Sequence, residues 1–172
     1  MSLASLCALI ALLPLSLMPH QDSSSADKVE SMPIDLHAAF ESSRIRHSDT
    51  AFEDLTEVDR VLTSIWVLEA DVNNGGFDQY YFNSSGDSAY YAPVAFRAIG
   101  APTMAGIVEK ANSRFGPGGP PRSRSDRQEA LLAMEDGLWN DLDDQFYAYP
   151  ENLSELLEAF LRPRQISNSV DI

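Results

Sequence analysis

Apolar residues recur at helical spacing over most of the chain. The clearest run begins at Leu55 and returns every three or four residues, at Val58, Leu62, Ile65 and Glu69, with Val61 and Trp66 on the same side. This periodicity predicts an amphipathic helix. Glu69 falls on the apolar face, where a carboxylate is unusual. We expect the helix to stop at Asn73-Asn74-Gly75-Gly76, because these residue types tolerate left-handed backbone.

Further helices are predicted downstream. The apolar stripe of Tyr90–Ala98 ends at Gly100 and Pro102, with Pro93 tolerable only near its first turn. Three more helices are expected to begin at Thr103, at a Ser125/Gln128 capping box that leads through Leu138, and at Asn152, with Pro163 closing the last. A short helix is also compatible with Ile34–Phe40. Since no stretch alternates with a period of two, we predict an all-α fold, a single compact domain of five or six short helices.

The N-terminal region differs from the rest. Met1–Met18 has no charged side chain, and Gln21–Glu30 is polar and rich in serine. We therefore divide the chain into a leader and linker (1–31, disordered or processed), a helical domain (32–165) and a tail (166–172). Three alternatives stay open for the leader: a weak export signal, a retained anchor, or a misassigned start. The protein is exported in the first case and cytoplasmic in the third.

Charge narrows the choice of partners. The chain has 26 acidic and 12 basic residues, a net charge of −14. Such a field repels nucleic acid and anionic membranes and favours basic partners, although acidity can also serve solubility alone. Nine acids and no Lys or Arg lie between Glu129 and Glu158, and four arginines precede this window: Arg114, Arg122, Arg124 and Arg127. We interpret the C-terminal third as an acidic surface behind a short basic loop.

The sequence contains few recognisable metal-binding or catalytic motifs. The Asp71–Phe82 segment has the length of a calcium loop, but Gly75 and Phe82 occupy two ligand positions. The histidines lack a zinc-site spacing, no nucleotide or nucleophile motif is present, and Cys7, the only cysteine, lies in the leader. The candidates for an acid–base pair are Glu69 and Asp78. We favour a structural role for this segment. Glu69 is expected to accept backbone N–H groups at the turn, and the side chains of Asn73, Asn74 and Gln79 to form the other hydrogen bonds of the turn. The aromatic residues that follow are expected to enter the core: Tyr80, Tyr81 and Phe82. We expect no metal, no cofactor and no enzymatic activity.

Three motifs carry a family resemblance. The first is Glu69–Asn83 with its Asn-Asn-Gly-Gly-Phe-Asp-Gln-Tyr centre (Asn73 to Tyr80, which includes Phe77), and the others are Ala98–Ala101 and Leu142–Tyr147. Together they span about 56–163, and this region resembles the DNA-mimic-protein C-terminal domain family, most of whose members are of unknown function. The resemblance implies an all-α acidic domain. The best-known member of this family looks like a DNA mimic, whose carboxylate-covered surface occupies the DNA-binding face of a transcription factor. Carboxylates on successive helical turns are about 5–6 Å apart, of the order of phosphate spacing. The candidates for this acidic surface are Asp141, Asp143, Asp144, Glu151, Glu155 and Glu158.

Three functional hypotheses follow. The first is a non-enzymatic domain that binds the basic surface of a protein, such as a DNA-binding protein, without contacting nucleic acid or any membrane beyond the leader. The second is a helical interaction or immunity-like domain that is recognised by shape, so that its acidity is incidental. The third is a hydrolase that uses Glu69 and Asp78. The shared motif lies in the turn rather than on the acidic surface, so it is a better guide to fold than to function.

Overall fold

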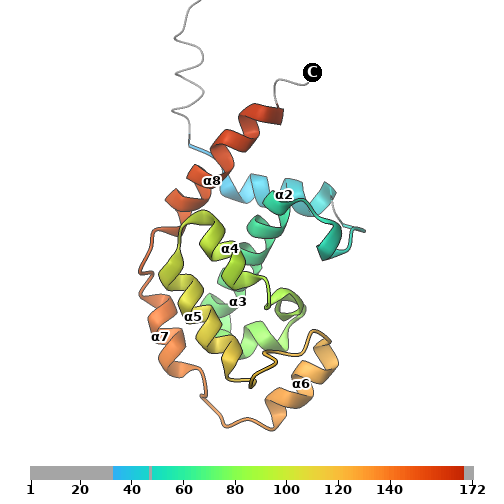
Figure 1. Ribbon diagram of the computed structural model, residues 1–172, viewed down its shortest axis with the longest axis vertical. Helices are drawn as coiled ribbons and strands as arrows, with labels where there is room; N and C mark the ends of the chain where they lie inside the picture. Colours follow the sequence, from blue (N-terminus) through green and yellow to red (C-terminus); the bar gives the residue numbers. More distant parts are fainter. Residues whose placement is uncertain (1–32, 47, 169–172) are drawn as a thin grey trace, which may run out of the picture. The chain divides into compact units, whose positions relative to one another are not determined.

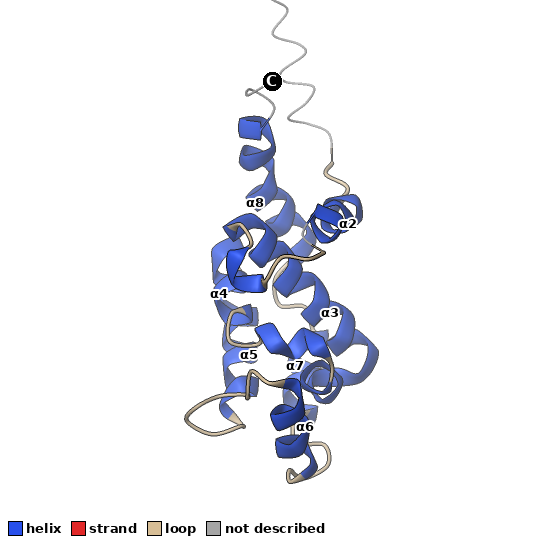
Figure 2. Cartoon of the chain, turned by 90° about the vertical axis from the view of Figure 1, so that its right-hand side faces the viewer, coloured by secondary structure: helices blue, strands red, loops and turns tan. Residues whose placement is uncertain are grey.

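The structure is a computed structural model that describes residues 33–46 and 48–168. The predictions for the leader and linker (1–31) and for the last residues of the tail (169–172) lie outside the described residues. Within those residues every regular element is helical (Figure 2), which confirms the all-α prediction. None of these helices combines the length and apolar character that a membrane crossing needs.

Seven α-helices and two 3-10 helices follow one another in the described residues. Their order is α2 (Leu36–Arg46), η1 (Phe52–Asp54), α3 (Glu57–Phe82), η2 (Ser84–Ser88), α4 (Ala92–Ile99), α5 (Pro102–Ser113), α6 (Arg124–Leu132), α7 (Asn140–Tyr147) and α8 (Leu153–Asn168). The predicted number of helices was therefore slightly low, because α7 was not predicted as a separate helix.

Helix α3 is the centre of the fold, with α2, α4, α6 and α7 packed against it (Figure 1). Helices α2 and α8 lie at one end of the described domain and α6 at the other (Figures 1 and 2). Of the predicted apolar stripe of α3, Val61, Leu62 and Ile65 are at most 2% exposed, whereas Val58, Trp66 and Glu69 are half-buried. The buried face continues through Leu68 and Val72, which were not predicted. Tyr80 and Tyr81 are also fully buried, whereas Phe82 is 51% exposed, so the prediction that Phe82 enters the core was wrong.

Several predicted helix ends are corrected. The cap of α6 is Ser123, whose hydroxyl accepts from the Asp126 N–H, and not Ser125. This helix ends at Leu132 instead of running through Leu138. A left-handed Gly137 (φ 70°) lies in the connection to α7, and glycine adopts that conformation readily.

Prolines also shift two helix boundaries. Pro163 lies inside α8, which continues to Asn168, so it does not close the helix. Helix α5 begins at Pro102, so Thr103 is not its cap. Proline is favourable at the first helical position, because the N–H that it lacks would have no partner within the helix. Pro93 lies in the first turn of α4, where it was expected to be tolerated.

Candidate functional site

The predicted glycine turn corresponds to a kink in α3. Gly75 (φ −161°, ψ 27°) and Gly76 (φ 73°, ψ −175°) leave helical geometry, and the helix then resumes through Phe82. The predicted stop is thus a break between two helical segments. Gly76 occupies a region of backbone space that is essentially restricted to glycine.

A carboxylate from α7 holds this kink. The Phe77 N–H donates to Asp143 Oδ1 at 2.8 Å. A Cβ on Gly76 would lie 2.7 Å from Asp143 Oδ2, so the absence of a side chain at this position allows α7 to approach. We had expected Glu69 to accept backbone N–H groups at the turn, but the acceptor is Asp143, which is 66 residues from Phe77 along the chain.

Glu69 and Asn73 have a different partner. Both contact the Tyr149 hydroxyl, which donates to Glu69 Oε1 at 2.9 Å and accepts from Asn73 Nδ2 at 2.5 Å. Tyr149 has a φ of 43° and is the one non-glycine residue with positive φ in the described chain. These contacts join the first segment of α3 to the turn between α7 and α8.

Asp71, which the sequence analysis did not single out, organises the polar side chains after the kink. Its Oδ1 accepts from Gln79 Nε2 at 3.0 Å and from Asn83 Nδ2 at 2.9 Å, and its Oδ2 accepts from the Ser85 hydroxyl. Gln79 Oε1 in turn accepts from Asn74 Nδ2 at 3.0 Å. The amides of the motif therefore tie the two segments of α3 to η2.

Five carboxylates gather beside the kink, and we call them the acidic face: Asp78, Asp136, Asp141, Asp143 and Asp144. They come from the second segment of α3, the α6–α7 connection and α7. All are exposed except the half-buried Asp143. Two of the five, Asp78 and Asp136, were not among the predicted surface acids.

Neighbouring charges perturb the acidic face. Desolvation raises the pKa of Asp143, the Phe77 N–H opposes this, and the charges of Asp78, Asp144 and Asp141 add to the rise. The pKa of Asp78 is raised by desolvation and by Asp136. A cation placed over the face would offset this mutual repulsion.

The six acids predicted from the sequence lie in different settings. Asp141 pairs with Arg114 at 2.7 Å, and Glu158 pairs with Arg162 at 3.4 Å. Glu151 accepts from the Thr103 and Met104 N–H groups at 2.7 and 2.9 Å, which caps α5. Asp144 and Glu155 are exposed.

These acids also belong to two parts of the fold. Helix α7 packs on α3 and α5, whereas α8 packs on α4 and α2. The three acids of α7 therefore belong with Asp78 and Asp136, apart from the acids of α8.

The four arginines do not form an exposed basic loop. Arg127 is 0% exposed, and its guanidinium donates to the carbonyl oxygens of Tyr81, Pro121, Arg122 and Asn83 and to Asp87 Oδ1. A Cβ on Gly86 would come within 2.7 Å of Arg127 Nε. Arg127 thus fastens the end of α3 and η2 to the segment before α6.

The other three arginines are engaged nearer the surface. Arg114 pairs with Asp141, Arg124 Nε donates to the Phe82 carbonyl at 3.1 Å, and Arg122 pairs with Glu53 at 3.2 Å.

The described residues offer little for catalysis. No group of three or more His, Cys, Asp or Glu side chains there is placed to hold a metal ion. Glu69 accepts a hydrogen bond from Tyr149, and Asp78 lies in the acidic face. The surface also has an open groove between α2, η1, α3 and η2, but neither carboxylate lines it. The geometry therefore gives the hydrolase hypothesis no support.

Comparison with known proteins identifies one relationship. Searches of curated proteins and of solved structures return no match to the chain. A family model described as DMP19-like protein matches residues 53–164. The matched region contains the kink, the acidic face and the capping carboxylate Glu151. The resemblance to DNA-mimic proteins is thereby confirmed, and the chain belongs to the DMP19-like protein family.

Proposed function

We propose that this protein is an acidic, non-enzymatic binding domain that occupies the basic surface of a DNA-binding protein in place of DNA. The name of the family suggests DNA mimicry, and the net charge of −14 favours a cationic partner. The observation that carries the proposal is the acidic face, where Asp143 feels the charges of Asp78, Asp141 and Asp144, and Asp78 feels that of Asp136.

The acidic face has the physical properties that a phosphate substitute needs. Four of its carboxylates are exposed. Asp141 is already paired with Arg114, whereas Asp78, Asp136 and Asp144 can accept hydrogen bonds from arginine and lysine side chains of a partner. Their mutual repulsion is relieved when cations approach, and this relief favours the complex. Binding of this kind weakens as salt is added, because ions screen the attraction between exposed charges.

The scaffold also holds α7, which carries three of the five carboxylates, in place. Asp143 is bonded to the Phe77 N–H, and the Tyr147 hydroxyl donates to the Val72 carbonyl at 2.8 Å. Both contacts attach α7 to the two sides of the α3 kink. Charges that are already in place lose little conformational entropy when a partner binds.

The test compares two variants with equal changes in charge. Asp78, Asp136 and Asp144 are replaced by asparagine in the first, which leaves the structural carboxylate Asp143 intact. Asp49→Asn, Asp54→Asn and Glu129→Gln form the matched control, since these three acids are also exposed and lie outside the acidic face.

Each immobilised protein is used to capture partners from the native host, and the captured protein is identified, purified and titrated. We expect to recover a DNA-binding protein. The wild type and the control should bind it equally well, and the acidic-face variant should bind it at least tenfold more weakly. Duplex DNA should displace it from the wild type. Equal binding by the two variants, or a ternary complex with DNA, would refute DNA mimicry.

Exposed aromatic side chains support a second candidate, a helical interaction domain recognised by shape. Tyr147 and Tyr149 are 45% and 38% exposed, and Tyr147 lies beside Asp143 and Asp144. Tyrosines are enriched among the residues that dominate protein interfaces. A complex that persists in 1 M salt (roughly a 3 Å screening length) and is lost in Tyr147→Ala would favour this candidate over electrostatic mimicry.

A further inference from the structure

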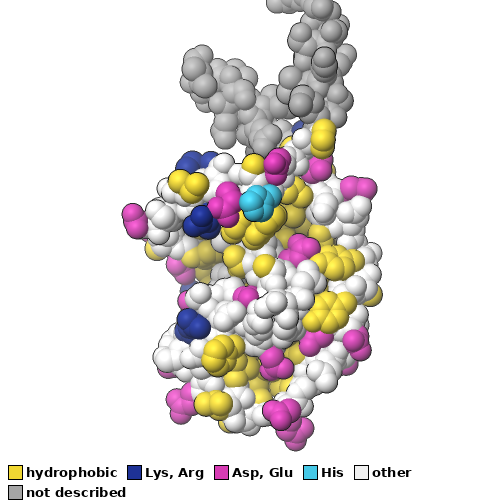
Figure 3. Space-filling model, turned by 180° about the vertical axis from the view of Figure 1, so that it is seen from behind, with side chains coloured by type: hydrophobic (Ala, Val, Ile, Leu, Met, Phe, Trp, Pro, Cys, Tyr) yellow, Lys and Arg dark blue, Asp and Glu magenta, His cyan; other side chains and the backbone are white. Residues whose placement is uncertain are grey.

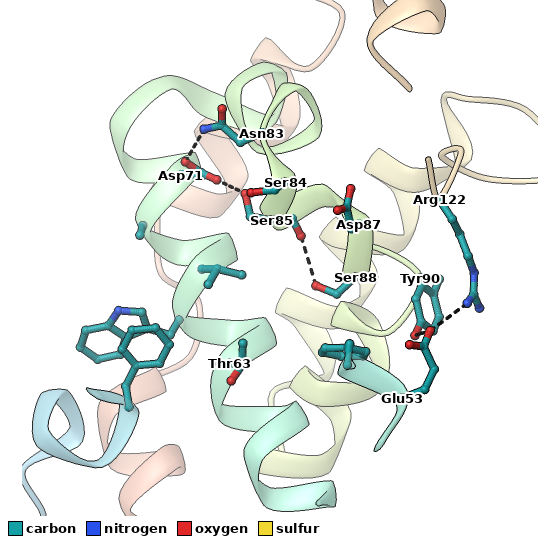
Figure 4. A pocket seen from close by; sticks show the side chains of 15 residues that line it. Glu53, Thr63, Asp71, Asn83, Ser84, Ser85, Asp87, Ser88, Tyr90 and Arg122 are labelled. Carbon is teal, nitrogen blue, oxygen red and sulfur yellow. Dashed lines mark hydrogen bonds and ion pairs between the residues drawn. The ribbon is translucent and has the colours of Figure 1, made fainter. Parts of the chain in front are cut away.

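The structure has an open groove of about 780 Å³ that shares no residue with the acidic face. Its walls come from α2, η1, α3 and η2, and Arg122 stands at one rim (Figure 4). This volume lies within the range of sites that hold small ligands or a few side chains of a partner.

One end of the groove is aromatic. Phe40 of α2 stacks on Trp66 of α3, with ring centroids 4.8 Å apart and planes inclined by 13°. Val67 and Ala70 continue this wall along α3. Trp66 and Val67 are half-buried and Ala70 is exposed, so an apolar side chain that entered here would remove further apolar surface from water.

The rest of the groove is acidic and rich in hydroxyl groups. Asp71 is held by three donors, and the serines of η2 lie across from Thr63 of α3 (Figure 4). Asp87 Oδ1 pairs with the buried Arg127 at 2.6 Å, yet the Asp87 side chain is 53% exposed. An incoming donor can therefore reach a carboxylate that is already fixed in position.

The negative charge of the groove favours a positively charged ligand. Three carboxylates line it (Glu53, Asp71 and Asp87), against the single cation Arg122. Arg122 is committed to Glu53 at 3.2 Å and lies over the Tyr90 ring at 3.7 Å. Figure 3 shows acidic side chains along the length of one face of the molecule, interspersed with hydrophobic ones. The net charge of −14 likewise favours a cationic segment over an anionic one.

We propose that this groove docks a segment of a partner protein in which an arginine or lysine adjoins a large apolar side chain. The apolar side chain packs against Phe40 and Trp66, and the cation lies between Asp71 and Asp87. Because the groove shares no residue with the acidic face, the proposal does not depend on DNA mimicry.

Tryptophan fluorescence offers a direct test. The chain has two tryptophans, of which Trp66 lines the groove and Trp139 is 0% exposed in the core. The probe is the peptide acetyl-Leu-Arg-Leu-amide, and acetyl-Leu-Gln-Leu-amide is its neutral match. We expect saturable quenching by the arginine peptide, at least fivefold weaker binding of the glutamine peptide, and loss of the signal in Trp66→Phe. Absence of saturation up to about 10 mM, beyond even millimolar affinity, would overturn the proposal.

Variants locate the site. Ala70→Arg places a cation in the groove from an exposed helical position and should weaken peptide binding at least tenfold. Asp87→Asn should weaken it severalfold, whereas Asp144→Asn on the acidic face should leave it unchanged. Amide chemical shifts verify that the Ala70→Arg variant retains the fold. This variant is the more decisive of the two, because Asp87→Asn also removes a partner of the buried Arg127.

Amide chemical shifts of the wild type recorded as the arginine peptide is added locate its binding site. Three outcomes would refute the proposal: unaltered binding in Ala70→Arg, peptide-induced shifts confined to α7, or equal affinity for acetyl-arginine-amide alone. The last would identify a site for small cations instead of a protein segment.

Discussion

Gly76→Ala is expected to destabilise the protein by about 3 kcal/mol. At φ 73° and ψ −175° the alanine side chain would impose backbone strain of about 1–3 kcal/mol. Its Cβ would also meet Asp143 Oδ2 at 2.7 Å. Relief of that contact requires α7 to move away from the Phe77 N–H, and loss of this hydrogen bond costs a further ~1–2 kcal/mol.

Two other glycines provide matched controls for the same chemical change. Gly106 lies inside α5 with nothing within 4 Å of an added Cβ, so Gly106→Ala should stabilise the protein by about 0.5–1 kcal/mol. Gly75 has extended backbone (φ −161°), and an added Cβ there would meet Gln79, whose Cβ would be 3.0 Å away and whose side-chain amide would have to shift from its hydrogen bonds with Asn74 and Asp71. Gly75→Ala should still stay within about 1 kcal/mol of the wild type.

Urea unfolding followed by circular dichroism measures all three variants. With a slope of about 2 kcal/mol per molar urea, Gly76→Ala should lower the midpoint by about 1.5 M. In an Asp143→Ala background the same substitution should cost about 1 kcal/mol less, because the obstructing carboxylate is gone. A loss for Gly76→Ala no larger than that for Gly75→Ala would refute the proposed geometry of the kink.

Three further predictions concern single side chains. Arg127→Lys should cost about 3 kcal/mol or more in urea unfolding, because an ammonium cannot replace five directed donors in a buried site, whereas the exposed Arg124→Lys should change stability little. Desolvation raises the pKa of Glu151, but its hydrogen bonds outweigh this and the net shift is downward. The stability that Glu151 contributes is therefore fully present above pH 4.5 and lost as pH falls through its lowered pKa, so thermal melts of Glu151→Gln and wild type should converge in acid. Asp78 has a raised pKa, so its ionised form weakens the fold at neutral pH. Asp78→Asn should raise the melting temperature at pH 7, and this gain should fade as pH falls through the raised pKa and vanish below pH 3.8.

Several local features of this protein were predicted correctly from its sequence, although some helix ends were not. A stripe every three or four residues predicted α3 and its buried face, and paired glycines predicted the interruption at Gly75 and Gly76. The cap of α8 was also predicted, and the Glu155 N–H donates to Asn152 Oδ1 at 3.4 Å. Each of these depends on backbone preferences and side chains only a few residues apart, so a single sequence contains enough information to infer them.

The identity of the structural carboxylates and cations was decided only by the tertiary structure. The Phe77–Asp143 contact joins residues 66 positions apart, and the Arg127–Tyr81 contact joins residues 46 apart. A charge count treats Arg127, Glu151 and Asp144 as equivalent surface groups, although one is buried, one caps a helix and one is exposed. Burial and partners arise from how the helices pack, and α7, whose acids carry the proposed function, takes its position from contacts with α3 and α5. Sequence periodicity thus determined the helices and the sign of the charge, while packing determined which charges remain available to a partner.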